Sequence, residues 1–472
     1  MKNYQLILLT TVLFITLFYG ETMGLNFGIL GIAYALLTYF KTPQKNRTRT
    51  FYFLVATSIL SSIAFAWYGD FVSFLAVLTS ISLMVFKSKN RALKTILAVP
   101  VFGLNFLTFI YRFFQFEEWL PKRNTGGLAQ KIISVVLIPV VFIIIFLFIY
   151  SSGSDHFSKI FTDYDFDFNL WEFLALGGLG FFIAFNLWNF KMYPIFYSQN
   201  HALKDDFLNE DKSQKSTYSF LDLDAERKSG VVSLLALNIL LVIFIITFNY
   251  EQFVEVVKTP NQLSAETHER VNAVILSIIM AILVILFYFK GSFNFDKKAK
   301  SLKILAQIWM TLNAVLVISA FAKNGEYILN FGMTYKRLGV CAFLILAVVG
   351  LIITFIKIQK QKTNAYLFNR MIWFFYGIIL VSSYFNWGGI ATQYNITHKK
   401  GNLDFLRTLN FNHQLLKDHF PKEYPDLQND SYFYRVDIEN ETFLSKILYF
   451  ENLKPKQNEK TALVNSANSD EL

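Results

Sequence analysis

Residues 338–357 read LGVCAFLILAVVGLIITFIK, with no charged side chain before the lysine that closes the run. A helix of about 20 predominantly apolar residues crosses the hydrocarbon core of a bilayer. Similar runs recur along the chain at 5–20, 25–40, 51–67, 71–86, 95–111, 132–150, 171–190, 231–249, 271–289, 304–322 and 371–388. The sequence therefore predicts an all-α polytopic transmembrane helical bundle of about 11–12 membrane segments, with 5–20 as an uncleaved first helix.

The composition agrees with a membrane protein. Of the 472 residues, 54% are hydrophobic and only 17% are charged, whereas a soluble chain carries about 25% charged residues. The net charge is +10, but the Lys and Arg residues fall in short loops between the apolar runs, where they fix orientation. This placement argues against nucleic acid as a partner. The single cysteine, Cys341, excludes a disulfide within the chain.

The loop charges predict an orientation. Four loops are basic, at 41–49, 87–94, 290–303 and 357–370, and two are acidic, at 155–167 and 251–269. Cytoplasmic loops carry an excess of Lys and Arg. We therefore expect the N-terminus and the basic loops in the cytoplasm, and both acidic loops outside.

The run at 95–111 conflicts with that scheme if it crosses the membrane, because the third and fourth basic loops would then lie outside. The run contains Pro100, Gly103 and Asn105. Proline removes a backbone donor, and irregular backbone at membrane depth persists only where protein or water satisfies it. We favour a segment that enters and returns, which leaves eleven crossings and an external C-terminus. The alternative is twelve crossings.

The polar parts of the chain are small. Residues 1–396 are predicted to form the membrane domain, 397–453 a small extramembrane region, and 454–472 a disordered tail. An amphipathic stretch at 403–420 has near-helical spacing and is a candidate surface for protein partners. His413 and His419 on it are six positions apart, which does not suit a metal pair on one helix face, so we expect surface histidines.

The polar side chains inside the apolar runs are mostly amides. An amide in a membrane helix usually hydrogen-bonds a neighbouring helix, whereas several together can line a polar cavity. The absence of a buried carboxylate weakens proton-coupled or sodium-coupled transport as a function. The candidates are Asn105, Asn186, Asn238, Asn272, Gln307, Asn313 and Asn386.

The segment before residue 338 predicts a contact for an anion or a lipid. Gly332 permits a sharp turn, and Thr334 can cap the helix that follows. Arg337, beside Lys336, then lies in the first turn of that helix, where the dipole disfavours a cation. Such a residue needs a partner, which can be a phosphate headgroup, a ligand or Glu326. The alternative is ordinary snorkelling to the interface.

Part of the chain also resembles a family. The residues that carry the resemblance are His268, the stretch Tyr288 to Lys298, Trp309 with Asn313, Tyr327, the stretch Gly332 to Val340, Trp387, and Thr392 to Ile396. Over about 265–396 the chain resembles an uncharacterised membrane family of bacteria, of Bacteroidetes/Flavobacteria type, with a domain of unknown function. Met333 stands where the family has Leu, and Gly388-Gly389 where it tends to have an acidic or bulky residue. The resemblance implies an architecture and a bacterial cytoplasmic membrane, but no catalytic residues.

Three classes of function remain open. The first is a non-enzymatic membrane protein with a signalling, envelope or scaffold role, which binds membrane lipids and protein partners. The second is a transporter or lipid-handling protein with an amide-lined cavity. The third is a membrane enzyme, which would need carboxylates or histidines gathered at one membrane face. We favour them in that order and predict no catalytic residue, metal ligand or cofactor.

Overall fold

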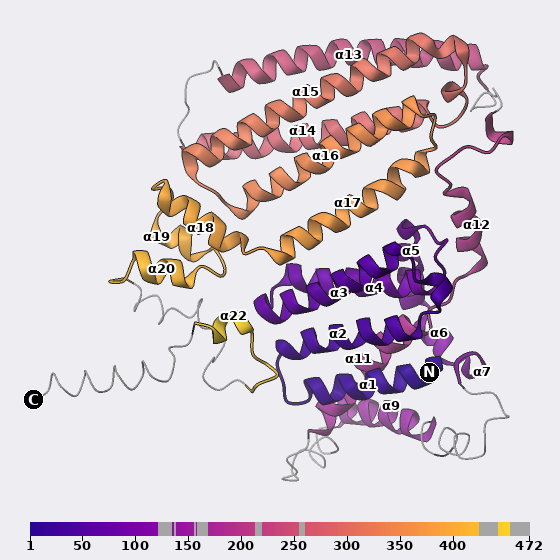
Figure 1. Ribbon diagram of the computed structural model, residues 1–472, viewed down its shortest axis with the longest axis vertical. Helices are drawn as coiled ribbons and strands as arrows, with labels where there is room; N and C mark the ends of the chain where they lie inside the picture. The colour runs from indigo at the N-terminus through magenta and orange to yellow at the C-terminus, as the bar shows by residue number, and fades with distance from the viewer. Residues whose placement is uncertain are drawn as a thin grey trace, which may run out of the picture. The chain divides into compact units, whose positions relative to one another are not determined.

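A computed structural model describes residues 1–120, 135, 138–154, 157, 169–212, 220–253, 260–423 and 442–453 (Figure 1). Every regular element in these ranges is a helix, which confirms the all-α class. The chain divides into two compact units. Unit 1 comprises Met1–Phe196 and Asn429–Leu472, and unit 2 comprises Tyr197–Gln428.

Unit 1 is built around four helices, of which short turns join α1 to α2 and α3 to α4. The α3 helix packs on α4 and on α2, while α1 packs on α11. Thr48 and Asp70 cap α3 and α4 by accepting a backbone N–H. The elements are α1 (Asn3–Phe18), α2 (Leu25–Lys41), η1 (Gln44–Asn46), α3 (Arg49–Tyr68), α4 (Phe71–Lys89), η2 (Thr95–Leu97), α5 (Ala98–Leu107), α6 (Phe109–Phe113), α7 (Phe116–Trp119), α9 (Ile138–Gly153), α11 (Leu170–Trp188) and α22 (Leu448–Glu451). The α12 helix (Pro194–Ala202) spans the boundary of the units.

Small hydroxyl side chains bring α3 and α4 close together. Ser58, Ser61 and Ser62 of α3 and Ser80 of α4 are buried, and the Ser61 and Ser80 hydroxyls lie 3.3 Å apart. In lipid, helices associate through close packing of small residues and hydrogen bonds between helices. The serines therefore serve the packing of unit 1.

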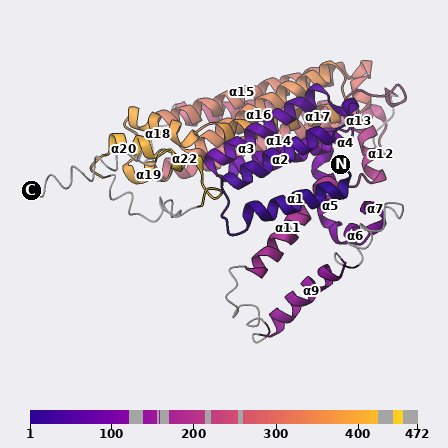
Figure 2. The same ribbon diagram turned by 60° about the horizontal axis from the view of Figure 1, so that its bottom comes forward.

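Unit 2 is a row of long antiparallel helices followed by three short ones. In it α15 packs on α13 and α16, and α16 packs on α17. Its buried core includes Leu234, Ile285, Leu302, Leu316 and Leu344. The elements are η4 (Glu210–Lys212), α13 (Leu223–Phe253), α14 (Pro260–Tyr288), η5 (Ser292–Asn294), η6 (Lys297–Ala299), α15 (Lys300–Phe331), α16 (Tyr335–Gln359), α17 (Asn364–Tyr384), α18 (Trp387–Thr397), α19 (Leu403–Arg407) and α20 (His413–His419). The last three gather at one end of α15 and α16 (Figure 1 and Figure 2).

The helices suit a membrane. Within the described residues, seven are long and apolar enough to cross one: Arg49–Tyr68, Phe71–Lys89, Leu170–Trp188, Leu223–Glu251, Lys297–Phe331, Tyr335–Gln359 and Asn364–Tyr384. Four shorter apolar helices are Asn3–Phe18, Leu25–Lys41, Thr95–Leu107 and Asn272–Tyr288. Each predicted apolar run overlaps a helix of the structure. The protein is thus a multi-pass helical membrane protein.

The structure differs from the sequence prediction beyond the apolar runs. The helix over the predicted run 304–322 is longer than the run, because α15 continues as far as Phe331. The stretch 403–420 is two helices, because Phe411 adopts a positive φ of 57° between them. The α18 helix was not predicted. His413 is half-buried, so the prediction of a surface histidine is wrong there, whereas His419 is exposed.

Some predictions fall outside the described residues. These are the tail 454–472, nearly all of the acidic loop 155–167, and residues 254–259 of the other acidic loop. The flanks of that second loop are helical, in α13 and α14. The side chain of His268 also lies outside the described part.

Candidate functional site

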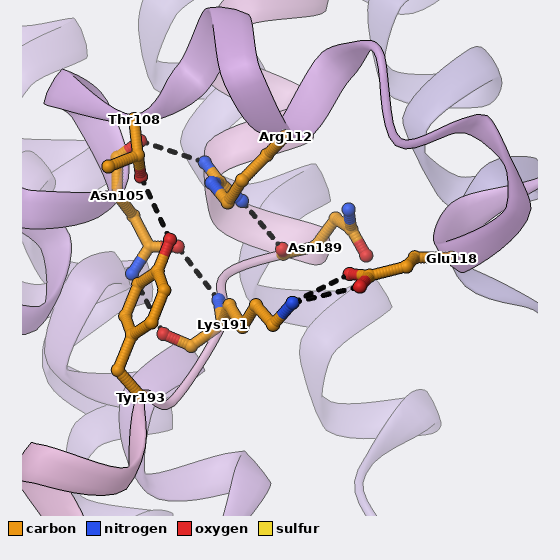
Figure 3. A network of polar contacts seen from close by, with 7 residues as sticks. All are labelled: Asn105, Thr108, Arg112, Glu118, Asn189, Lys191 and Tyr193. Carbon is orange, nitrogen blue, oxygen red and sulfur yellow. Dashed lines mark hydrogen bonds and ion pairs between the residues drawn. The ribbon is translucent and has the colours of Figure 1, made fainter.

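The candidate site in unit 1 is centred on Arg112 of α6, a buried charged residue. Its side chain is buried, with the residue 2% exposed. The guanidinium donates to the carbonyl oxygens of Asn189 and Asn105, both at 2.8 Å, and to Oδ1 of Asn186 at 2.5 Å. Figure 3 shows Arg112 between the ends of two helices. Asn105 is in the last turn of α5, and Asn189 is the C-cap of α11.

The charge of Arg112 is balanced by helix ends. The last carbonyl groups of a helix lack partners within it, and its dipole places negative charge there. Arg112 also lies over the ring of Phe185, 5.0 Å from its centre. Among the described residues no carboxylate forms an ion pair with it. Its Nε is buried without a hydrogen-bond partner in the described part of the chain.

Asn105 joins α5 to the stretch that follows α11. Its Nδ2 donates to the carbonyl of Lys191 at 3.0 Å, and its Oδ1 accepts from the Lys191 backbone N–H at 2.7 Å. The Lys191 ammonium pairs with Glu118 at 2.9 Å. The hydroxyls of Thr108 and Tyr193 are 3.1 Å apart (Figure 3). We call this set of seven residues, with Asn186, the arginine network.

The arginine network bears on the path of 95–111. Lys89, before this segment, donates to the carbonyl of Phe190, and Glu118, after it, pairs with Lys191. Both ends of the segment therefore contact the same short stretch, 190–191. The α5 helix itself has ten residues, about 15 Å at 1.5 Å per residue, which is half of the hydrocarbon thickness.

In unit 2 a second buried cation, Lys357 of α16, also binds the carbonyl end of a helix. The residue is fully buried, and its ammonium donates at 2.7 Å to the carbonyl of Phe289, just past the end of α14. Asn294 donates to the same carbonyl at 2.9 Å. Two groups thus cap the C-terminal end of α14, where a cation is favoured. We expected Lys357 in a basic loop, and the structure places it inside the bundle.

An ion pair connects the first turns of α13 to the loop before α15. Arg227 lies 2.7 Å from a carboxylate oxygen of Asp296, which is buried. Burial raises the pKa of Asp296. The hydrogen bonds that it accepts from the Arg227 guanidinium and the Lys298 backbone N–H, together with the positive charges of the Arg227 and Lys298 side chains, outweigh burial and lower the pKa below its usual value. Asp296 also accepts from the Lys298 backbone N–H at 2.8 Å.

The structure brings only two of the predicted amides together, Asn105 and Asn186. Asn238 donates from α13 to the carbonyl of Leu305 at 3.1 Å, which is a bond between helices. Asn313 donates at 2.8 Å to Trp309 of its own helix. Gln307 is half-buried and Asn272 is exposed. Asn386 lies after α17 rather than within it, as the N-cap of α18.

The segment predicted to contact an anion is folded on itself. Thr334 is the N-cap of α16 and accepts from the Arg337 backbone N–H at 3.3 Å. The Arg337 guanidinium donates to the Gly332 carbonyl and lies 5.5 Å from the centre of the Tyr327 ring. Glu326 pairs with Lys323 at 3.2 Å, and Lys336 is exposed.

Sequence reasoning missed Asn395 of α18. Its Oδ1 accepts from the Met333 backbone N–H at 2.6 Å, and its Nδ2 donates to the Met333 carbonyl at 2.9 Å. A single buried amide in a helix of 11 residues gives no hydrophobic periodicity that would identify it. Asn395 and Met333 both lie in the resembling stretches, so their joint presence was the only pointer.

The chain matches a known family over most of its length. Residues 49–416 match the family model of a domain of unknown function, DUF4153. No curated protein and no solved structure matches the chain. The helices α1 and α2 and the segment 442–453 lie outside the matched residues. Because the match covers more than half of the sequence, the chain belongs to the DUF4153 family.

Proposed function

We propose that the protein is a non-enzymatic, multi-pass protein of the bacterial cytoplasmic membrane that presents a folded surface to a protein partner. That surface is the C-terminal layer, which we define as residues 387–420 and which contains α18, α19 and α20. The observation that carries the proposal is the way in which three asparagine side chains fasten this layer. A host of Bacteroidetes type agrees with the resembling stretches of sequence.

The asparagines act as clamps between backbone segments. Asn395 binds both backbone groups of Met333, in the turn between α15 and α16. Asn386 accepts from the Gly389 backbone N–H at 2.8 Å and donates to the Phe411 carbonyl at 2.7 Å. Asn412 donates to the Thr392 hydroxyl at 2.7 Å and to the Leu406 carbonyl at 2.8 Å. Asn386 and Asn395 each use both ends of the amide, whereas Oδ1 of Asn412 has no partner among the described residues. Clamps of this kind favour one conformation, which pre-organises a binding surface.

The outward face of the C-terminal layer is polar. Its exposed side chains include Gln393, Lys399, Asp404, Gln414 and Lys417. Lipid-facing positions would be apolar, so this face suits water and a polar partner. The buried anchors beneath it are Leu406, Leu409 and Leu416.

In the proposed topology the N-terminus and the four basic loops lie in the cytoplasm, and the C-terminal layer lies outside. The segment 95–111 enters and returns on the cytoplasmic side. The contacts of Lys89 and Glu118 with residues 190–191 support this, because α9 and α11 alone then separate Lys89 from Phe190, and two crossings return to the same side. Anionic lipid headgroups are the expected partners of the basic loops.

The alternative function, transport or lipid handling, is favoured by two other amides. The Oδ1 atoms of Asn238 and Asn313 are buried and have no hydrogen-bond partner among the described residues. A polar path needs such free groups. If water or substrate does not reach Asn313, then Asn313→Leu should raise the melting temperature, because it removes an unsatisfied buried group. Unchanged or lowered stability would favour the alternative.

Photo-crosslinking in living cells tests the proposed partner. A photoreactive residue at Gln393 or Gln414 should give a discrete crosslinked protein species. The same residue at Val232, exposed on α13, should give lipid adducts only. Asn395→Ala should abolish the protein species while the membrane level of the chain stays constant. Lipid adducts at all three positions would contradict the proposal.

A further inference from the structure

Residues 442–453, which we call the strap, lie on the turn between α1 and α2. The backbone N–H groups of Leu25 and Asn26 donate to the carbonyls of Lys446 and Leu444, each at 2.9 Å. The Thr22 backbone N–H donates to the Ser445 hydroxyl at 2.8 Å. More than 400 positions of sequence separate these partners, and both belong to unit 1.

The turn between α1 and α2 supplies donors for the backbone carbonyls of a bound peptide. Leu25 and Asn26 are in the first turn of α2, where backbone N–H groups have no acceptor within the helix. The strap carbonyls provide those acceptors. Asn26 is fully buried and shapes the turn, because its Oδ1 accepts from the backbone N–H groups of Gly24 and Phe27, both at 2.8 Å. Its Nδ2 donates to the Leu17 and Thr22 carbonyls.

Side chains add selectivity to these backbone contacts. The Glu21 carboxylate accepts from the Ser445 hydroxyl at 2.6 Å and also from the Thr442 hydroxyl. Hydrogen bonds to an ionised acceptor are the stronger kind. Ile447 fits over Gly69, where a Cβ would lie 2.5 Å from the Ile447 Cδ1. Phe443 is 69% exposed, so it contributes little to recognition.

The fit is close at Gly24. A Cβ there would lie 2.1 Å from the Ser445 carbonyl oxygen and 2.8 Å from the Lys446 carbonyl oxygen. Backbone atoms of the strap cannot give way as a flexible side chain can. The turn thus matches the strap in shape. Its backbone N–H groups face the strap's acceptors, Glu21 faces the strap's hydroxyl groups, and the space over Gly69 accepts an aliphatic side chain.

We infer that residues 20–26 together with Gly69 form a binding site for a peptide that turns at 442–445, as the strap does, and that carries hydroxyl side chains at the positions of Thr442 and Ser445 and an aliphatic one at Ile447. The strap occupies this site in the chain. Because its contacts are local to residues 442–447, recognition does not require the covalent connection to the rest of the chain. Apart from Gly69, the site lies outside the DUF4153 match, and it is independent of the proposed function.

The test uses the full chain in detergent, with a protease site inserted between 424 and 441. After cleavage the strap should stay bound and exchange with a labelled peptide of residues 442–453, as measured by fluorescence anisotropy. Glu21→Gln should weaken peptide binding about tenfold, because a charge-assisted bond becomes a neutral one. Glu326→Gln, in unit 2, should leave it unchanged.

Gly24→Ala is the decisive variant, and Gly178→Ala is its matched control, since a Cβ at Gly178 meets nothing within 4 Å. Gly24→Ala should abolish peptide binding, and in the uncut chain it should expose Lys446 to trypsin. Gly178→Ala should do neither. A folded, cleaved protein that fails to bind the peptide saturably, or a Gly24→Ala variant that behaves like the control, would overturn the inference.

Discussion

Arg112 illustrates what a single buried cation does in this chain. Its guanidinium reaches the ends of two helices at once, which a planar fork of donors allows and a single ammonium does not. It supplies a donor to carbonyl groups at the ends of α5 and α11, which lack a partner within their own helices.

We expect Arg112→Lys to lower the stability of the detergent-solubilised protein by about 3 kcal/mol, because two bonds to a charged donor are lost. The melting temperature measures this. Arg91→Lys, at an exposed position, is the control. Equal melting temperatures for the two variants would mean that a point charge is enough at position 112.

Arg337 remains a candidate contact for an anion or a lipid. Its guanidinium lies against Tyr327 and Phe331, and Glu326 is engaged with Lys323. We therefore expect Arg337→Lys to reduce the anionic phospholipid that co-purifies with the protein, since Lys does not bind a phosphate bidentately. Glu326→Gln should not change it. If Arg337→Lys retains the lipid, the residue is a snorkelling anchor.

At the scale of elements, the C-terminal layer contains a titratable group that its packing keeps neutral. Burial lowers the pKa of His413 from its ordinary value of 6.5 to about 4. The folded layer then resists protonation that the unfolded segment accepts. Its stability is fully present above pH 6.5 and falls as the pH drops from 6.5 towards 4.

Hydrogen exchange should detect this change. We expect the amides of α18–α20 to exchange faster at pH 5 than at pH 7, after correction for the intrinsic rate, while those of α16 do not. His413→Gln should remove most of the difference. A layer equally protected at both pH values would show that His413 does not couple to its folding.

Hydrophobic runs predicted the membrane helices because burial in lipid demands about 20 apolar residues wherever a helix crosses. The same reasoning ended the apolar run at residue 322, whereas α15 continues to Phe331, because a helix can continue past the membrane where its charges reach water. The candidate site was harder. Asn105 and Asn186 were found as intramembrane amides, but their meeting at Arg112 depends on tertiary packing, as does the burial of Lys357.

At the scale of the whole molecule, the strap constrains the number of crossings. Residues 444–446 contact residues 25–26, so the two segments lie on one side of the membrane. Within the part of the chain that the structure describes, ten long helices separate them, α2, α3, α4, α9, α11 and α13 to α17, and we expect each of them to cross. Ten crossings return the chain to the same side, and an eleventh crossing by 95–111 would not.

Single cysteines in a Cys341→Ala background, probed with an impermeant thiol reagent in intact cells, test this topology. Positions 45, 297 and 362 should be protected, and positions 163 and 399 should be labelled. A reporter fused after position 122 should behave as cytoplasmic. Labelling at 297 with none at 163 would reverse the scheme, and an external reporter would make 95–111 a crossing.

The length of α15 has a consequence for the bilayer itself. The helix has 32 residues, and its charged Lys303 and Lys323 lie twenty positions apart, which is about 30 Å along the axis. Between them the helix has no charged side chain, so the two lysines mark the levels of the two headgroup layers. The protein should consequently be most stable in lipids whose hydrocarbon layer is about 30 Å thick. In shorter-chain or longer-chain lipids α15 has to tilt, or the surrounding leaflets have to deform to meet it.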